Sequence, residues 1–250
     1  MSCVGAAAPG WSLVHVVDPA QLPLALEIAD HARFDTFVGA ANGAAVEHVR
    51  AVAAGRADFL WIWGARGAGK THLLQAACRA AAVAERRAMY VPLDLDLQPE
   101  ILAGLDAVDL LALDGVDGVA GAGDWERALF VLLNGIAERR GGLLLAARVS
   151  PAAAGFRLPD LASRAGGAIC YRLKPLDDDE RVLALRGHAA ARGLEIERAA
   201  AEYLLARVHR DMTDVGVWLE RLDRASLAEQ RKITIPFIRE LLAAPGAGGE

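Results

Sequence analysis

The stretch GARGAGKT, residues 64–71, constrains this chain more than any other feature of its sequence. It fits the pattern G-x-x-x-x-G-K-[ST], in which glycines let backbone N–H groups turn around phosphates. The apolar run FLWIW at 59–63 precedes it, and the helically spaced run HLLQAACRAAAVAERR at 72–87 follows it. A strand before the loop and a helix after it are the context that the motif requires. The sequence therefore predicts a phosphate-binding loop. A plain glycine turn would need no Lys-Thr pair after it.

The residues of this loop have separate expected tasks. Lys70 is expected to reach the β- and γ-phosphates of a nucleotide, and Thr71 is expected to bind Mg²⁺. The positive end of the following helix adds to the attraction for phosphate. His72 is interpreted as part of the helix start and not as a catalytic base. From this stretch the predicted nucleotide contacts are Gly64, Arg66, Gly67, Ala68, Gly69, Lys70, Thr71 and His72.

A second carboxylate is expected at the end of another core strand, because a P-loop protein also holds its metal ion from that side. The run DLLALD at 109–114 supplies Asp114 there, although an acid that merely caps the strand is the alternative. In active ATPases of this general type the next residue is usually a second acid that prepares the attacking water. Here it is Gly115, and Asp117 is out of register with that pattern. The chain is thus equipped to bind nucleotide and Mg²⁺, but poorly equipped to hydrolyse the nucleotide alone.

Short apolar runs alternate with helical patterns through the first two thirds of the chain. Besides the two runs already described, strands are predicted at 88–93, 142–147 and 168–173. The run at 124–140 is an amphipathic helix with a basic last turn. Continuous apolar strands separated by helices indicate a parallel sheet that is covered on both faces.

After Pro175 the pattern is helical only, and the acids at 177–180 are typical of a helix start. The predicted fold is an α/β domain with a parallel sheet, followed by a small all-α domain. The predicted domains are a flexible N-terminal tail at 1–30, an α/β nucleotide-binding domain at 31–174, a helical domain at 175–243 and a disordered end at 244–250.

The charge and the cysteines exclude some classes of function. Net charge is −5, so the chain has no overall electrostatic reason to bind nucleic acid strongly. Cys3, Cys78 and Cys170 are odd in number and far apart, as expected of reduced thiols in a cytoplasmic protein. No run reads as a membrane span, and the N-terminal segment has no basic region of the kind that begins a signal peptide.

Arg164 ends the stretch LPDLASR at 158–164, which is predicted to be a short helix just before the last strand. An arginine that one subunit projects onto a neighbour's γ-phosphate stabilises the negative charge of the transition state. Position alone would favour an ordinary surface arginine. The order of the motifs favours an arginine finger that acts in trans.

With the motifs in this order, the chain resembles the AAA+ ATPases of the DnaA initiator clade, and within that clade the Hda-type regulators that inactivate DnaA. The resemblance covers nearly all of residues 20–242. It implies an AAA+ P-loop domain with a helical lid, in which Phe34, Phe37 and Val38 contact the adenine base. The matching stretches are FDTFVGAANGAAVEHV, GARGAGKTHLLQA, LLALDGVDGV, LPDLASR and LERLDRASLAEQRKITIPFIRELL.

The resemblance also implies a function. Such a protein binds ADP or ATP with Mg²⁺, docks on the sliding clamp (the β subunit of DNA polymerase III), and offers Arg164 to ATP bound on DnaA. Hydrolysis of that ATP makes it a cytoplasmic negative regulator of replication initiation, and the resemblance is compatible with a homo-oligomer. Gly115 suits this role, because a protein that stimulates hydrolysis on its partner needs no water-activating acid of its own.

Two rival functions remain. A free-standing ATPase of helicase-loader type would show appreciable turnover by itself. An initiator fragment would bind DNA in a salt-dependent way, but the chain is acidic and we find no helix-turn-helix for sequence-specific DNA binding.

The hexamer QLPLAL at 21–26 alternates apolar and other residues after a polar anchor. It can be read as an edge strand of the protein's own core, although Pro23 would remove one ladder donor. An extended peptide of this kind also suits a preformed groove on a partner. It resembles the clamp-binding hexamer of Hda-type proteins, with Gln21, Leu22, Leu24 and Leu26 as the contacts.

The chain departs from the family pattern at two sensor positions. The first is the polar sensor position after the fourth strand, where an acid or a hydroxyl is more usual. In this chain it falls in AARVS and is occupied by Ala147 and Arg148. The lid arginine expected near DMTDVG aligns with Thr213, and Arg210 lies one turn away. Both departures bear on how the chain would sense the state of its nucleotide.

Overall fold

The computed structural model describes most of the chain, namely residues 32–93, 96–208, 218–219, 221–226 and 232–243, and the backbone of 11–12 and 28–29. Two short strands, β1 (Trp11–Ser12) and β2 (Ile28–Ala29), pair in antiparallel fashion. The hexamer at 21–26 lies between them in the chain but outside the described residues, as do Arg210, Thr213 and 244–250.

A five-stranded sheet in the order β4-β5-β6-β3-β7 forms the centre of the molecule, and all of its pairs are parallel. This confirms the predicted parallel α/β fold. The strands are β3 (Phe59–Trp63), β4 (Ala88–Pro92), β5 (Leu110–Asp114), β6 (Gly142–Ala147) and β7 (Ile169–Arg172).

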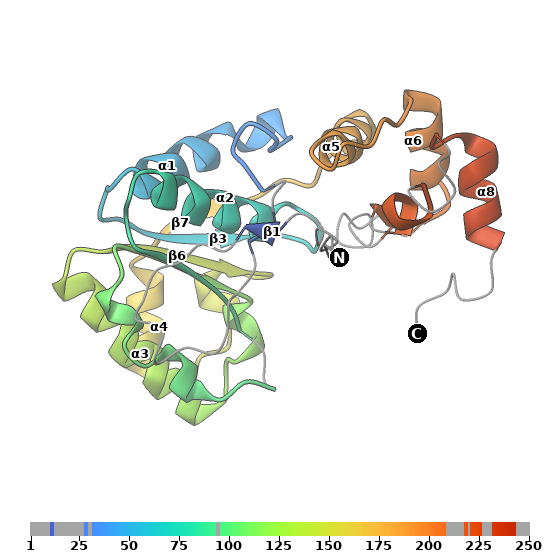
Figure 1. Cartoon of the computed structure of the whole chain (residues 1–250). Coiled ribbons are helices and arrows are strands. Elements are labelled where there is room, and N and C mark those ends of the chain that lie inside the picture. The colour runs from blue at the N-terminus through green and yellow to red at the C-terminus, as the bar shows by residue number, and fades with distance from the viewer. Residues whose placement is uncertain are drawn as a thin grey trace, which may run out of the picture.

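Helices cover both faces of this sheet, as the apolar strands require. One face carries α1 (Gly43–Ala53) and α2 (Lys70–Val83), and the other carries α3 (Gly123–Glu138) and α4 (Pro159–Gly166) (Figure 1). Each face has its own cluster of buried apolar side chains. Short 3₁₀ turns are η1 (Ala40–Asn42), η2 (Pro99–Leu102), η3 (Leu105–Ala107), η4 (Val116–Gly118) and η5 (Pro151–Ala153).

A smaller helical group follows the sheet domain. It contains α5 (Asp178–Ala190), α6 (Arg198–Leu205) and α8 (Ile235–Ala243). Asp177 caps α5, because its carboxylate accepts the Glu180 N–H at 2.8 Å while the Glu180 carboxylate accepts the Asp177 N–H at 3.1 Å. These helices bury a third apolar cluster of their own. The predicted helical domain is therefore present, with its predicted start signal.

Side-chain contacts join the helical group to the sheet domain. The Asn42 side chain is 4% exposed and binds the backbone of Lys174 at both ends, donating to its carbonyl at 3.0 Å and accepting its N–H at 2.8 Å. The Glu180 carboxylate accepts the Ala40 N–H at 3.3 Å. The start of α1 and the start of α5 are thus tied together above the sheet (Figure 1).

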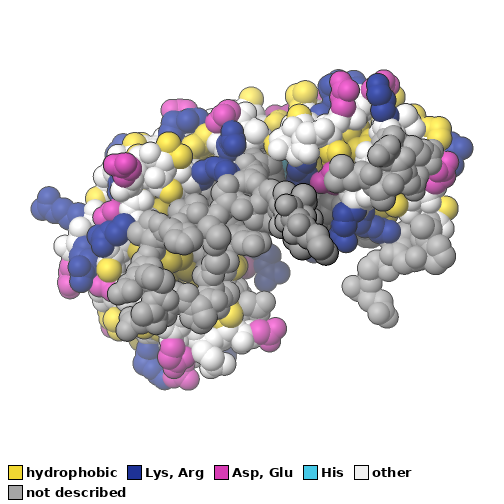
Figure 2. Space-filling view, viewed as in Figure 1, with side chains coloured by type: hydrophobic (Ala, Val, Ile, Leu, Met, Phe, Trp, Pro, Cys, Tyr) yellow, Lys and Arg dark blue, Asp and Glu magenta, His cyan; other side chains and the backbone are white. Residues whose placement is uncertain are grey.

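Charges of both signs are interspersed over the described surface that Figure 2 shows. Such a mixture gives no single-sign field on that face for steering a polyanion. Among the helices that the structure describes, none has the length and apolar character needed to cross a membrane.

Candidate nucleotide-binding site

The loop at 64–69 connects the end of β3 to the start of α2, as the motif predicts. Two of its glycines are required by close approach. A Cβ on Gly64 would lie 2.8 Å from the Leu173 carbonyl oxygen, and a Cβ on Gly69 would lie 2.8 Å from the Phe37 ring. Gly69 also has a left-handed φ of 91°, which a side chain would strain. Any larger residue at Gly64 or Gly69 would therefore have to displace Leu173 or Phe37.

Lys70 lies at the loop itself. Its ammonium donates to the carbonyl oxygens of Gly64 and Ala65, each at 2.8 Å. Of the other loop residues, Ala68 is buried, whereas Arg66 is exposed. The structure thus places Gly64, Gly67, Gly69 and Lys70 together between β3 and α2.

The two predicted metal ligands are in direct contact. The Thr71 hydroxyl donates to Asp114 Oδ2 at 2.5 Å, and the Tyr90 hydroxyl donates to the same oxygen at 3.1 Å. Burial raises the pKa of Tyr90 above its usual range, and the negative charge of Asp114 raises it further, so the phenol remains a donor. A hydroxyl and a carboxylate at one point are hard oxygen ligands that suit Mg²⁺. The residues present therefore fit the ion.

A cavity of about 370 Å³ lies beside Lys70 and Asp114. Gly115, which also lines it, has a left-handed φ of 78°, and a Cβ there would lie 3.3 Å from the Leu93 carbonyl oxygen. Asp117 lines the cavity too, but Arg148 holds its carboxylate in an ion pair at 3.0 Å. The nearest substitute for the missing second acid is therefore neutralised.

The predicted adenine segment divides into two parts. Phe34 is 7% exposed in the core, with the Arg50 guanidinium 4.5 Å from its ring centre. The Phe37 ring instead lies against Gly69 and makes an edge contact with the His72 ring at 5.6 Å. Val38 is half-buried. Phe37 is the one of the three that the structure places against the phosphate loop.

His72 sits where the loop, the N-terminal segment and the lid meet. Its Nε2 donates to the Arg33 carbonyl at 2.8 Å, and its ring stacks on His188 of α5 with ring centres 5.5 Å apart. Burial lowers the pKa of His72, and the hydrogen bond to Arg33 opposes this. His72 thus belongs to the helix start, as predicted. The His188 contact was missed because it depends on how the lid packs.

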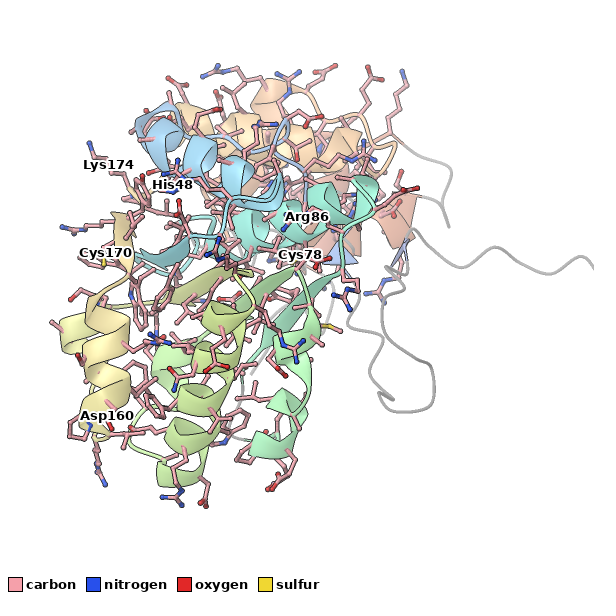
Figure 3. All side chains as sticks on the ribbon, turned by 90° about the vertical axis from the view of Figure 1, so that its left-hand side faces the viewer. His48, Cys78, Arg86, Asp160, Cys170 and Lys174 are labelled. Atoms are coloured by element: carbon pink, nitrogen blue, oxygen red, sulfur yellow. The ribbon has the colours of Figure 1, made fainter. Side chains whose placement is uncertain are left out.

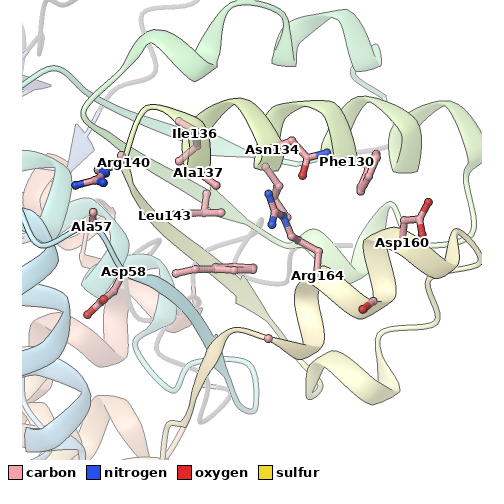
Figure 4. Close-up of a pocket in the computed structure, with 15 residues that line it drawn as sticks. Ala57, Asp58, Phe130, Asn134, Ile136, Ala137, Arg140, Leu143, Asp160 and Arg164 are labelled. Carbon is pink, nitrogen blue, oxygen red and sulfur yellow. The ribbon is translucent and has the colours of Figure 1, made fainter.

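Arg164 lies at the opposite edge of the sheet from the loop. It lines a cavity of about 830 Å³ with Asp58 and Phe59, where β3 begins, and with Asn134 of α3 (Figure 4). The five residues of β3 separate the two edges by about 13 Å. The Arg164 guanidinium makes no hydrogen bond or ion pair with another residue that the structure describes. At this separation the Arg164 side chain does not reach its own loop.

Glu126, in the first turn of α3, is a buried residue that sequence reasoning missed. It is 1% exposed, and its carboxylate accepts the N–H groups of Gly121, Arg157 and Leu158 at 2.6–3.0 Å. Burial alone would raise the pKa of Glu126, but these backbone donors outweigh burial and hold the pKa below its usual range. Because Leu158 is the residue before α4, Glu126 fixes the start of the Arg164 helix. The sequence signal that could have identified Glu126 is its position as an acid on the apolar face of α3.

The described cysteines take no part in either site. Cys78 is buried in α2, and burial raises its pKa to about 12. Cys170 is exposed on β7, an edge strand of the sheet, where its thiol donates to the Ala168 carbonyl at 3.4 Å (Figure 3). Among the described residues, no three His, Cys, Asp or Glu side chains are placed to hold a metal ion together. Cys3 lies outside the described residues.

Comparison with known proteins covers both domains. Residues 28–164 match the family model of the bacterial DnaA ATPase domain, and residues 178–242 match the model of the Hda lid domain. Together these matches extend over the two parts of the molecule that the structure separates, the sheet domain and the helical group.

Solved structures share the same fold. Domain III of the Thermotoga maritima replication initiation protein DnaA matches with a TM-score of 0.72 and 21% identity, over 84% of this chain and 95% of that one. A replication initiator DnaA bound to AMPPCP and single-stranded DNA gives 0.65 and 23%, over 82% and 69%. The Thermotoga maritima RuvB Holliday junction branch migration motor gives 0.61 and 17%, over 84% and 71%. These likenesses confirm the predicted AAA+ fold with its helical lid.

Proposed function

Because the chain belongs to the bacterial DnaA ATPase domain family and carries an Hda-type lid domain, we propose that it is a negative regulator of replication initiation that acts on DnaA. It binds adenine nucleotide at its own loop, docks on the sliding clamp, and supplies Arg164 to ATP bound on DnaA. The observation that carries this proposal is Arg164 at the sheet edge opposite the loop, because its guanidinium has no hydrogen-bond or ion-pair partner among the described residues.

The nucleotide part of the proposal is supported by the loop and by the pair formed by Thr71 and Asp114, whose oxygens are 2.5 Å apart. A DnaA of the same fold has been solved with AMPPCP bound. In this chain Lys70 would meet the outer phosphates, Thr71 and Asp114 would hold Mg²⁺, and Phe37 would pack beside the loop. The ion would supply positive charge against the phosphates.

The action on DnaA follows from the chemistry of phosphoryl transfer. Negative charge is spread over the γ-phosphate oxygens in the transition state, and a guanidinium placed against them stabilises that charge. Arginine fingers of this kind are worth on the order of 10³–10⁵ in rate. Because Arg164 lies at the sheet edge opposite its own loop, we propose that it contacts the γ-phosphate of a nucleotide bound to a neighbouring molecule.

Hydrolysis by the chain itself is expected to be weak or absent. Gly115 provides no acid, and Asp117 is paired with Arg148. A free-standing ATPase of helicase-loader type would need a free carboxylate near Asp114 to activate water. The Asp117–Arg148 pair therefore favours a regulator over that alternative.

Clamp docking is proposed from the hexamer at 21–26 alone, since those residues lie outside the described part of the chain. Gln21, Leu22, Leu24 and Leu26 are the proposed contacts, and a cytoplasmic location follows from these partners. The proposal includes no sequence-specific DNA binding.

The test adds the protein to DnaA loaded with ATP, with and without clamp loaded on DNA, and follows ATP hydrolysis. We expect stimulation that requires the loaded clamp. A variant with Gln21→Ala and Leu22→Ala should lose the clamp-dependent part. Equal hydrolysis with and without clamp, or no stimulation at all, would contradict the proposal.

A further inference from the structure

Arg140 has a backbone conformation that favours a different residue type. It follows α3 and the capping residue Arg139, and its φ is 57°, in the left-handed region. The Arg140 N–H donates to the Ala137 carbonyl at 3.1 Å, and the Gly141 N–H donates to the Ile136 carbonyl at 2.9 Å. A helix end with these bonds usually has glycine in the left-handed position, where other residues are disfavoured. The helix end therefore gives no reason for an arginine.

The Arg140 side chain is exposed and lines the cavity of about 830 Å³ that Arg164 also lines. Figure 4 shows Arg140 at one end of this cavity, beside Ala57 and Asp58, with Arg164 nearer its middle. Asn134 faces Arg164 and lies six residues before Arg140, which corresponds to about 9 Å along a helix. Because a protein interface of standard size covers about 800 Å² on each partner, a protein that contacts Arg164 also reaches Arg140.

The acids closest to Arg140 are engaged by other cations. Asp58 Oδ2 lies 2.5 Å from Arg56 Nε, and Asp106 Oδ2 lies 3.1 Å from Arg139 Nε. The Arg140 guanidinium makes no hydrogen bond or ion pair with any residue that the structure describes. Since a guanidinium binds carboxylates through paired N–H groups, this exposed side chain suits a carboxylate of another molecule.

We propose that Arg140 is a docking residue, which pairs with a surface carboxylate of the DnaA molecule whose nucleotide Arg164 contacts. The inference rests on the proposed function and gives this edge a second arginine with a different task. Arg164 acts on the hydrolysis step, whereas Arg140 holds the partner in place. Charges at the rim of an interface act mainly on association, and their effect falls as the ionic strength rises.

A purely structural role competes with this one, because a basic residue near the C-terminus of a helix interacts favourably with the helix dipole. Replacing Arg140 would then change the stability of the fold and leave the affinity for DnaA unchanged. Glycine separates the two roles, since it removes the side chain and suits the left-handed backbone. Glu85, with φ 58° at the equivalent position after α2, does not line the cavity, so Glu85→Gly is the matched control.

The experiment follows single-turnover hydrolysis of ATP bound to DnaA, at saturating DNA-loaded clamp, as the concentration of the full chain is raised. Each curve gives a half-saturating concentration and a maximal rate, and the series is repeated at higher ionic strength. The proteins are the wild type, Arg140→Gly, Arg140→Glu, Arg140→Lys, Glu85→Gly and Arg164→Ala. Urea denaturation checks that each variant is folded.

For Arg140→Gly we expect a half-saturating concentration roughly tenfold above that of the wild type, with a maximal rate within about twofold. Its urea midpoint should be no lower than that of the wild type, because glycine relieves the left-handed backbone. Arg140→Glu should raise the half-saturating concentration further by repulsion, and Arg140→Lys should lie closer to the wild type. The difference between wild type and Arg140→Gly should shrink at the higher ionic strength.

An unchanged half-saturating concentration in Arg140→Gly and Arg140→Glu would overturn the docking role. A similar rise in Glu85→Gly would overturn it too, by assigning the effect to the backbone change. So would a lower maximal rate at an unchanged half-saturating concentration, since Arg140 would then act on hydrolysis. If the wild type gives no stimulation, or Arg164→Ala stimulates fully, the proposed function itself fails and this inference fails with it.

Discussion

The two edges of the central sheet are built differently. At the edge where the strands end, the Lys70 ammonium donates to the carbonyls of Gly64 and Ala65 at 2.8 Å. The Thr71 hydroxyl donates to Asp114 there at 2.5 Å. At the edge where the strands begin, Arg164 lines a larger cavity and has no hydrogen-bonding partner among the described residues.

In the proposed function, this difference separates the edge that holds a nucleotide from the edge that acts on a neighbour's nucleotide. At the first edge the hydroxyls of Thr71 and Tyr90 both meet Asp114 Oδ2, a preorganised cluster of oxygens. At the second edge the Arg164 guanidinium has no partner among the described residues, and the helix that carries it is held at its other end, where Glu126 accepts the Leu158 N–H. An arginine on a fixed helix, with no partner among the described residues, suits a site that a second molecule completes.

The largest expected effect on stability is at Glu126, which holds the start of the helix that carries Arg164. Glu126→Ala leaves the N–H groups of Gly121, Arg157 and Leu158 without their acceptor and should lower the free energy of unfolding by about 3 kcal/mol. Glu138→Ala, at the exposed end of the same helix, is the control and should change it by less than about 0.5 kcal/mol. Urea denaturation of both variants measures this. Similar effects for the two glutamates would remove Glu126 from its positioning role.

The next expected effect is on nucleotide binding, which should depend on Lys70 at one edge of the sheet and not on Arg164 at the other. Lys70→Ala should weaken nucleotide binding on the order of a hundredfold, because it removes a charged donor to the phosphates. Arg164→Ala should bind nucleotide as the wild type does, since it lies across the sheet. Calorimetry with ADP measures both. Weaker binding by Arg164→Ala would contradict the division between the edges.

A smaller effect is expected at Tyr90. Tyr90→Phe removes one donor to Asp114 and should lower the free energy of unfolding by about 1 kcal/mol. Tyr203→Phe is a suitable control in the lid, where the hydroxyl contacts Arg239 at 3.4 Å. Equal denaturation midpoints for wild type and Tyr90→Phe would show that the contact adds nothing measurable to stability.

The smallest expected effect is a pH dependence that comes from Glu126. Its pKa is lower in the folded chain than in the unfolded one, so its stabilisation is present above the unfolded pKa of about 4.3. It is lost as the pH falls through the folded pKa. Between pH 6 and pH 3 the wild type should therefore lose more stability than Glu126→Gln. Parallel losses in urea melts at the two pH values would argue against this linkage.

Local patterns were enough to predict much of the fold and one edge of the site. The glycine pattern, the apolar strand before it and Asp114 at a strand end each depend on neighbours in sequence. In the structure the Thr71 hydroxyl contacts Asp114. Trp125 could not be assigned from sequence to the core or to a partner contact, and it is 4% exposed within the core.

Contacts between distant segments were beyond those patterns. Periodicity placed Glu126 on a helix but could not show which loop passes over it. The Tyr90 contact depends on the register of β4 against β5, and the His72–His188 stack depends on the seating of the lid. Arg148 was noticed as a departure from the family pattern, but its partner Asp117 emerged only from the adjacency of β5 and β6.

The central claim is that Arg164 acts on a neighbouring molecule's nucleotide. Its most direct test is single-turnover hydrolysis of radiolabelled ATP bound to DnaA, at saturating loaded clamp, with wild type and Arg164→Ala. The account predicts that the variant still binds clamp and its own nucleotide but loses stimulation on the order of 10³-fold. Stimulation at the wild-type rate by a folded Arg164→Ala protein would contradict it.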